Sequence, residues 1–217
     1  MRHFLFFLSA LVMVSCADRY DVIIRNGTVY DGTGALGQRA DVGIKADTIA
    51  FIGDLSGAKA DLEIDATEKA VTPGFINMLS WAVESLIIDG NGESDIRQGV
   101  TLEVFGEGMS LGPLNDQMKK EMTQSMKRNP DFAYEIDWTT LGEYLQSLER
   151  RGVSPNVASF VGATTVRVHE LGYANRTASA EEMERMKNLV RKAMEEGAMG
   201  ILFDLCPSQL RAHRGVD

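Results

Sequence analysis

A short apolar stretch with a Pro-Gly break divides this sequence into two parts with different patterns. The stretch covers residues 71–81 and reads VTPGFINMLSW. Because proline lacks an N–H group, it suits the beginning of a strand rather than its middle. Short β-branched runs and turn signals precede the stretch, whereas strands and amphipathic helices alternate after it. We therefore predict that it contains the first strand of an α/β domain, which follows a small β domain.

Residues 20–70 have the pattern of that small β domain. Its apolar, β-branched runs lie at residues 21–25, 28–30, 40–44, 48–52 and 62–65. The first run stops at Asn26 and Gly27, a pair that is typical of a tight turn between strands. The pattern predicts a sheet of about five short strands, with an open edge unless another segment covers it.

Residues 71–205 alternate between strand and helix patterns. Further strands are predicted at residues 100–105, 156–161 and 199–203, and helices at 93–98, 115–127, 141–151 and 179–197. Repeated strand–helix–strand units imply a parallel sheet. A (β/α) barrel needs eight strands, whereas this sequence predicts four. The predicted fold class is α/β, with a small N-terminal β-sandwich-like module followed by an incomplete parallel (β/α) barrel.

The N-terminal residues predict export. Arg2 and His3 precede an apolar run at residues 4–14, and Ser15 and Cys16 follow it, which is the order of a secretory signal. The run is shorter than the roughly 20 apolar residues of a transmembrane helix. Its ending resembles a bacterial lipoprotein signal. We therefore expect a cell-envelope protein, lipid-anchored through Cys16 or periplasmic, with ordinary secretion and nearby cleavage as the alternative.

Composition and charge narrow the choice of partners. The net charge is −9, and no block of lysine or arginine stands out, which argues against nucleic acid as a partner. A membrane contact is expected only through the lipid anchor. We expect a signal and tether at residues 1–19, a β domain at 20–70, a partial barrel at 71–205 and an irregular tail at 206–217.

Two segments resemble the amidohydrolase superfamily, and the N-acyl-D-amino-acid deacylase branch fits best. The segment DVIIRNGTVYDGTG at residues 21–34 resembles the opening of these proteins, and PGFIN at residues 73–77 resembles their first barrel strand. In the family this strand ends in D-x-H-x-H, whose histidines bind metal. Here Asn77 replaces the aspartate, and Leu79 and Trp81 replace the two histidines.

The resemblance covers about residues 20–200 and implies a function. Its members are metal-dependent hydrolases of carbon–nitrogen bonds other than peptide bonds, so it implies a divalent metal, zinc, and a small N-acylated substrate. The family continues beyond the equivalent of residue 217, where its remaining histidine ligands lie. We therefore expect a truncated N-terminal portion whose own catalysis is weak or absent.

Glu107 is the candidate metal ligand. The segment at residues 105–114 reads FGEGMSLGPL and resembles the deacylase loop GNCGVSLAPL, in which the cysteine binds metal. Glu107 occupies the place of that cysteine, and a carboxylate at a strand end can bind a metal. The alternative is a solvated loop acid.

Ser80 and Arg167 are the candidate substrate-binding residues. Ser80 follows the first strand of the α/β part, where it could hold substrate or cap a turn. Arg167 ends the segment FVGATTVR, which resembles the family's LVGHGTLR, with Ala163 in place of the histidine. Arginine pairs well with a substrate carboxylate, although a surface salt bridge is an equal alternative. His169 follows, and we expect it to lie in a polar loop.

Two other functions remain open. Residues 108–112 fit the G-x-S-x-G motif of serine hydrolases, with Ser110 as the nucleophile and His169 or His213 as its base. Pro113 follows directly, where that motif needs a helix to be under way. The other possibility is a non-catalytic surface binding module that retains the family fold without its ligands.

Overall fold

The computed structural model describes residues 18–203. Cys16, Cys206 and His213 lie outside this range, so the predicted lipidation site and one candidate base are not described. The chain divides into two compact units between Pro73 and Gly74. The sequence-based boundary was three residues earlier. The difference arises because strand β5 (Ala70–Val71) pairs with β1 (Arg19–Val29) of the first unit.

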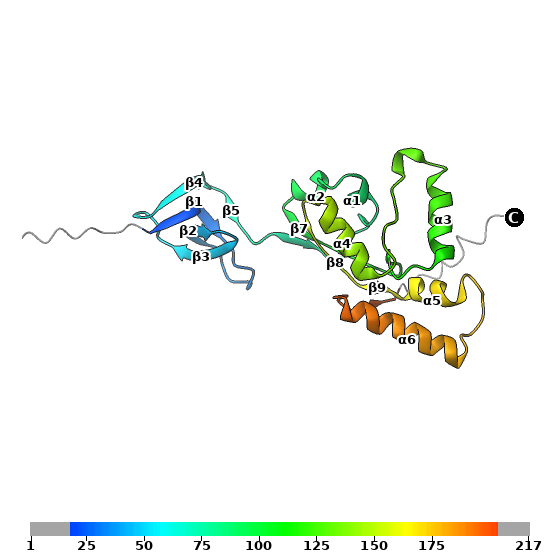
Figure 1. Ribbon diagram of the computed structural model, residues 1–217. Helices are drawn as coiled ribbons and strands as arrows, with labels where there is room; N and C mark the ends of the chain where they lie inside the picture. Colours follow the sequence, from blue (N-terminus) through cyan, green and yellow to red (C-terminus); the bar gives the residue numbers. More distant parts are fainter. Residues whose placement is uncertain (1–17, 204–217) are drawn as a thin grey trace, which may run out of the picture. The chain divides into compact units, whose positions relative to one another are not determined.

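The first unit is built on one five-stranded sheet (Figure 1). Besides β1 and β5 it contains β2 (Gln38–Lys45), β3 (Thr48–Gly53) and β4 (Lys59–Asp65). The strands run in the order β3-β2-β1-β4, with β5 also beside β1. The strand pairs β1–β2 and β2–β3 are antiparallel, whereas β4 and β5 run parallel to β1. The predicted β-sandwich-like arrangement is not confirmed, because the described residues of this unit form a single sheet.

The predicted turn at Asn26 and Gly27 is wrong, because both residues lie inside β1. Two residues lie between Ile24 and Gly27, but only one lies between their partners Val42 and Ala40 on β2, so the strand contains a bulge. Asn26 takes the left-handed backbone conformation at φ 62° that the extra residue requires. A Cβ atom on Gly27 would collide with the side chain of Val71. The pair therefore lets β1 continue and lets β5 approach it.

The second unit contains two parallel sheets, as the alternation of strands and helices predicts. The larger sheet has the order β6-β7-β8, formed by β6 (Phe75–Asn77), β7 (Val100–Phe105) and β8 (Asn156–Ser159). The smaller sheet pairs β9 (Val161–Gly162) with β10 (Ile201–Leu202). The short first strand predicted within residues 71–81 is the three-residue β6, which follows the Pro-Gly break.

The strand predicted at residues 156–161 is divided between these two sheets. Phe160 donates its backbone N–H to the Phe105 oxygen over 2.9 Å, whereas Val161 donates to the Gly200 oxygen over 2.9 Å. The hydrogen-bond partner therefore changes from β7 to the segment before β10 within one residue. A Cβ atom on Gly106 would collide with the carbonyl oxygen of Phe160, so a glycine is required at this crossing.

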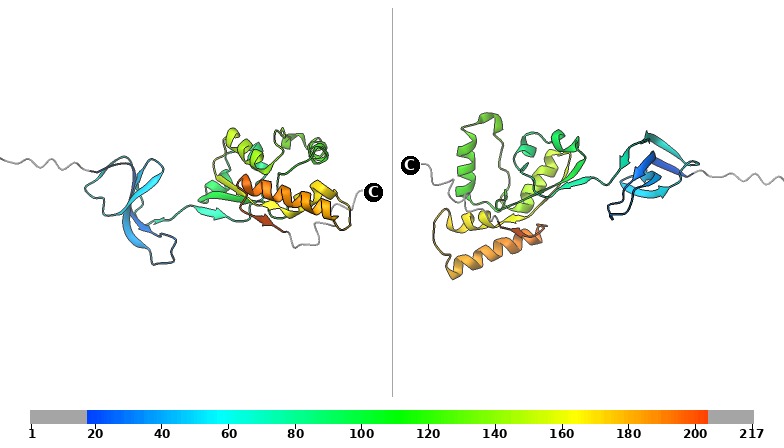
Figure 2. Two further views of the ribbon diagram at one scale, coloured as in Figure 1. Left: turned by 60° about the horizontal axis from the view of Figure 1, so that its bottom comes forward. Right: turned by 180° about the vertical axis from the view of Figure 1, so that it is seen from behind.

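Local capping signals fix the ends of the longer helices. The helices are α1 (Ser85–Ile88), α2 (Glu93–Ile96), α3 (Asp116–Met126), α4 (Leu141–Arg151), α5 (Ala163–Leu171) and α6 (Ala180–Glu195), with a short 3-10 helix at Pro130–Phe132. Thr140 with Glu143, and Ser179 with Glu182, form complete capping boxes at the beginnings of α4 and α6. Figures 1 and 2 show α5 beside α6, and α4 over the strands β7 and β8.

The largest core lies in the second unit and surrounds Trp138. The side chains of Trp138, Tyr144 and Phe105 are each only 1% exposed. Residues from α1, α3, α4, α5 and α6 complete this cluster. The first unit has a much smaller core of Tyr20, Ile23 and Leu55. Among residues 18–203, no helix combines the length and apolar character of a membrane span.

Candidate active site at the strand ends

The end of β6 is a turn held by two polar side chains. Oδ1 of Asn77 accepts a hydrogen bond from the Leu79 N–H over 3.3 Å, and Oγ of Ser80 accepts one from the Ala82 N–H over 3.2 Å. The Ser80 N–H donates to the Val104 oxygen over 2.9 Å, which ties the turn to β7. Both side chains thus stabilise the turn, the alternative role that the sequence left open for Ser80.

The same turn presents apolar side chains where the resemblance expects metal ligands. Leu79 is 50% exposed and Trp81 is 62% exposed. Neither side chain carries an atom that binds zinc, which is ligated by imidazole, thiolate or carboxylate. The end of β6 therefore supplies no strong metal ligand.

Glu107 lies at the end of β7 between two glycines with positive φ angles. Gly106 has a φ of 99° and Gly108 a φ of 67°, so the backbone turns sharply on both sides of the carboxylate. Its side chain is half-buried. Met109 donates its N–H to the Glu107 backbone oxygen over 2.6 Å and closes the turn. Glu107 thus lies on the edge where ligands gather in parallel α/β folds.

Ser110 is a buried link between the loop after β7 and the beginning of α5. Its hydroxyl donates to the Gly112 oxygen over 2.5 Å and accepts the Gly162 N–H over 3.0 Å. Its backbone N–H donates to Oγ1 of Thr165 over 2.7 Å, and that hydroxyl donates back to the Ser110 oxygen over 3.1 Å. The helix after this motif begins only at Asp116. This geometry favours a structural role for Ser110.

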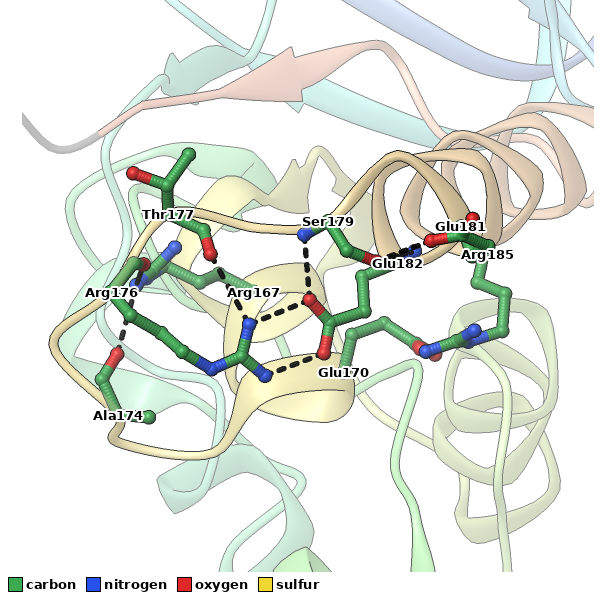
Figure 3. A network of polar contacts seen from close by, with 9 residues as sticks. All are labelled: Arg167, Glu170, Ala174, Arg176, Thr177, Ser179, Glu181, Glu182 and Arg185. Carbon is green, nitrogen blue, oxygen red and sulfur yellow. Dashed lines mark hydrogen bonds and ion pairs between the residues drawn. The ribbon is translucent and has the colours of Figure 1, made fainter.

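Arg167 organises the loop between α5 and α6 (Figure 3). Its Nη2 donates to the backbone oxygens of Ala174 and Arg176 over 3.0 and 2.8 Å. Arg176 in turn donates to both carboxylate oxygens of Glu182 over 2.7 and 2.5 Å. These hydrogen bonds connect the end of α5 to the first turn of α6. Three of the five guanidinium N–H groups of Arg167 take no part in the two carbonyl contacts.

The loop position predicted for His169 is wrong, because this residue lies in the last turn of α5. Its Nδ1 lies 3.0 Å from Oε1 of Glu170, whose other oxygen accepts from Arg185 Nε over 2.6 Å. The β-branched residues Thr164, Thr165 and Val166 follow Ala163. Because β-branched residues favour strands, the sequence did not indicate this helix. Among the described residues, the imidazole of His169 contacts Glu170 and not Ser110.

Glu103 is a polar residue of the second unit that the sequence analysis missed. It lies in the middle of β7 and is only 1% exposed. Its Oε2 has no hydrogen-bond partner within residues 18–203. The available signal was one charged residue inside the otherwise uncharged run VTLEVF.

The described residues do not form a complete site for a catalytic zinc ion. Within residues 18–203, no three histidine, cysteine, aspartate or glutamate side chains come together as a metal site would require. A catalytic zinc site usually has three protein ligands and one open position. Of the predicted site residues, only Glu107 offers a strong ligand atom at these strand ends.

Comparison with known proteins identifies relatives of the chain, although no protein-family model matches it. D-aminoacylase from Alcaligenes xylosoxydans is 33% identical over 183 residues, and N-acyl-D-glutamate deacylase from the same organism is 32% identical over 184 residues. Each alignment covers 84% of this chain and 37% of the relative. The chain thus spans little more than a third of the length of these relatives.

Solved structures agree with the sequence comparison. A crystal structure of D-aminoacylase, described as defining a subset of amidohydrolases, matches with a TM-score of 0.72 and 35% identity. N-acyl-D-glutamate deacylase from Bordetella bronchiseptica, complexed with zinc and a phosphonate inhibitor, matches with a TM-score of 0.73 and 27% identity. These matches cover 84% and 85% of this chain, and 38% of each of the two structures. The chain is therefore a homologue of D-aminoacylase and N-acyl-D-glutamate deacylase, and its structural neighbours are amidohydrolases.

Proposed function

We propose that this chain is an amidohydrolase of the N-acyl-D-amino-acid deacylase type with weak or no catalysis of its own. The observation that carries the proposal is the match to D-aminoacylase, at 33% identity along 84% of the chain. The parallel pairing of β6 with β7 supports it, because Ser80 follows the first of these strands and Glu107 the second. The proposed substrate class is a small N-acylated D-amino acid, cleaved at its amide bond.

A divalent metal, zinc in the first instance, is the cofactor that this function implies. Such a metal would supply an activated water molecule for attack on the amide. Glu107 is the proposed ligand, but one carboxylate does not hold a catalytic zinc ion, and Leu79 and Trp81 add no ligand atoms. Because the described residues do not fit this cofactor, we derive no metal-dependent step for them.

Two residues are proposed to contact the substrate. The Ser80 hydroxyl lies at the end of β6, although its oxygen already accepts the Ala82 N–H. Arg167 retains N–H groups that could pair with the carboxylate of an N-acyl amino acid. The position of Arg167 on α5, which begins directly after β9, supports this role.

The experiment that tests the proposed function is hydrolysis of N-acetyl-D-amino acids by the purified full chain with added zinc. We expect turnover near the uncatalysed background. A matched Glu107→Gln variant and a chelator-treated sample serve as controls. Robust hydrolysis that disappears in the chelator would overturn the proposed loss of activity while supporting the substrate class.

A non-catalytic surface binding module is the second candidate, and the apolar turn after β6 favours it. Leu79 and Trp81 are about half exposed and offer contact area in place of metal ligands. Calorimetric titration with N-acetyl-D-amino acids distinguishes the candidates. Saturable binding without hydrolysis or bound metal supports a binding module, whereas binding accompanied by hydrolysis supports the enzyme.

We also propose that the protein is exported and held at the cell envelope through Cys16. The support is the order of charged, apolar and small residues before this cysteine. Expression in a bacterium with labelled fatty acid tests the proposal, with Cys16→Ser as the control. We expect label in the wild type alone.

A further inference from the structure

One face of the sheet in the first unit is aliphatic on four strands. Residues that pair in register point to the same face of a sheet, and so do alternate residues along one strand. Val22 of β1 is in register with Ile44 of β2 and with Leu62 of β4. The neighbouring pairs extend this face to β3 (Figure 1). The aliphatic face consists of Val22, Ile24, Val42, Ile44, Ile49, Ile52, Leu62 and Ile64.

The alternation of residues in β4 indicates that this face belongs in an interior. Leu62 and Ile64 lie on the aliphatic face, whereas Asp61, Glu63 and Asp65 alternate with them and lie on the opposite face. A sheet with one solvated face carries its polar residues there and its apolar residues on the buried face. The pattern therefore predicts that another layer covers the aliphatic face.

The described residues leave the aliphatic face exposed. Ile49 is 59% exposed and Leu62 is 54% exposed, and Ile52 and Ile64 are close to half exposed. Within residues 18–203, the small core cluster of this unit includes no residue of the aliphatic face. The face presents on the order of 500 Å² of apolar surface, a size at which an exposed patch marks an interaction surface.

We propose that the aliphatic face binds the same face of a second copy of this chain, so that the two sheets form a sandwich. Charge supports this partner. The chain carries a net charge of −9, so two copies repel each other except through a contact that is free of charged groups. The residues of the aliphatic face are all uncharged. Because each copy uses the same surface, a two-fold axis would relate the two copies.

The area of the contact supports the same partner. Two facing copies would bury roughly 1,000 Å² in total, which is the lower limit for a specific protein–protein interface. Two sheets that pack face to face bury their inner apolar faces in this way. We expect an interface of this size to dissociate at micromolar concentrations or above. The contact lies in the first unit and the candidate active site in the second, so its test is independent of the hydrolysis assay.

Sedimentation velocity of the purified full chain tests the proposal. Over a range from about 1 to about 200 μM, we expect monomers at the low end and dimers at the high end. Leu62→Lys places a charge in the contact and should weaken dimerisation by at least about tenfold, because that charge must lose its water. Phe51→Lys is the matched control, since Phe51 is 45% exposed and is in register with Gly43 on the opposite face.

Two outcomes of the sedimentation experiment would overturn the proposal. One is a monomer over the whole range, as expected if another part of the chain covers the face. The other is a dimer that Leu62→Lys weakens no more than Phe51→Lys does. If Leu62→Lys does not fold, hydroxyl-radical footprinting of the wild type replaces it. Oxidation of Leu62 and Ile64 that falls with rising concentration, while that of Phe51 stays constant, supports the contact, whereas oxidation independent of concentration contradicts it.

Discussion

The interior around Trp138 and the turn after β6 belong to the same unit but differ in how their side chains are satisfied. Trp138 is 1% exposed, its Nε1 donates to the Leu111 oxygen over 2.6 Å, and its ring lies 5.3 Å from that of Tyr144. Trp81 is 62% exposed. The interior is closely packed and stabilises the fold. In the turn, the polar side chains of Asn77 and Ser80 accept backbone N–H groups, and the apolar side chains are exposed.

This difference shows that the residues that stabilise the fold are not the residues that would carry out catalysis. The core and the parallel strands give a TM-score of 0.72 against D-aminoacylase, so the scaffold is shared. At the end of β6, Leu79 and Trp81 occupy the positions at which the family resemblance implies histidines. A chain can therefore retain the architecture of a hydrolase when the residues of its strand ends change, because those residues contribute little to the core.

The largest effect is expected for Trp138→Ala. Removing this buried ring leaves a cavity and two tyrosines without their aromatic neighbour, which should lower the free energy of unfolding by about 3–5 kcal/mol. Trp81→Ala is the matched control, and we expect a change within about 0.5 kcal/mol because its ring is exposed. Urea unfolding measures both. Equal losses in the two variants would contradict the distinction between interior and turn.

Ser110→Ala should have a smaller effect on stability. The variant leaves the buried Gly162 N–H without its acceptor, which should cost about 1–3 kcal/mol. The exposed Ser94→Ala serves as the control. A fluorophosphonate probe should not label the wild type, because Ser110 lacks an adjacent base within the described residues. Labelling that Ser110→Ala abolishes would instead establish the serine hydrolase alternative.

Placing histidines at the turn after β6 tests whether this scaffold can bind zinc once ligand side chains are present. The double variant Leu79→His with Trp81→His should bind zinc about tenfold more tightly than the wild type, a difference of about 1.4 kcal/mol. Its stability without zinc should change little, because both side chains are about half exposed. Calorimetric zinc titration measures the gain. Unchanged zinc affinity would show that the end of β6 is not a place where a metal site can be rebuilt.

The smallest effect concerns Glu182 in the loop network of Figure 3. The hydrogen bonds from Arg176, and next from the Ser179 N–H, lower the pKa of Glu182 from 4.5 to about 2. A lowered folded-state pKa stabilises the folded form above pH 4.5, and this stabilisation is lost as the pH falls from 4.5 towards 2. Amide hydrogen exchange at the beginning of α6 should therefore accelerate in acid. Glu182→Gln should exchange faster at neutral pH and show less dependence on pH across this range.

Local signals in the sequence predicted α2, α3, α4 and α6, but they did not predict α1 or α5. The capping boxes at Thr140 and Ser179 are complete in the structure, and α4 occupies the predicted residues 141–151. A capping box depends on side chains three residues apart, so the local sequence is enough to predict where such a helix begins. The parallel pairing of β6, β7 and β8 followed from the alternation of strands and helices.

The errors arose where distant segments decide the conformation. Asn26 and Gly27 form a bulge because β5 pairs beside them, and β5 lies more than forty residues away. The strand at residues 156–161 breaks at Phe160 because two different sheets compete for its hydrogen bonds. Burial of Glu103 was likewise hidden, because its lack of a partner depends on the strands on both sides of β7.

The central claim is that the strand ends within residues 18–203 do not form a catalytic zinc site. Calorimetric titration of the purified full chain with zinc tests this claim most directly. We predict no saturable binding at micromolar zinc, because Glu107 has no second strong ligand beside it among the described residues. Binding of one zinc ion per chain in this range, lost in Glu107→Gln, would contradict the claim.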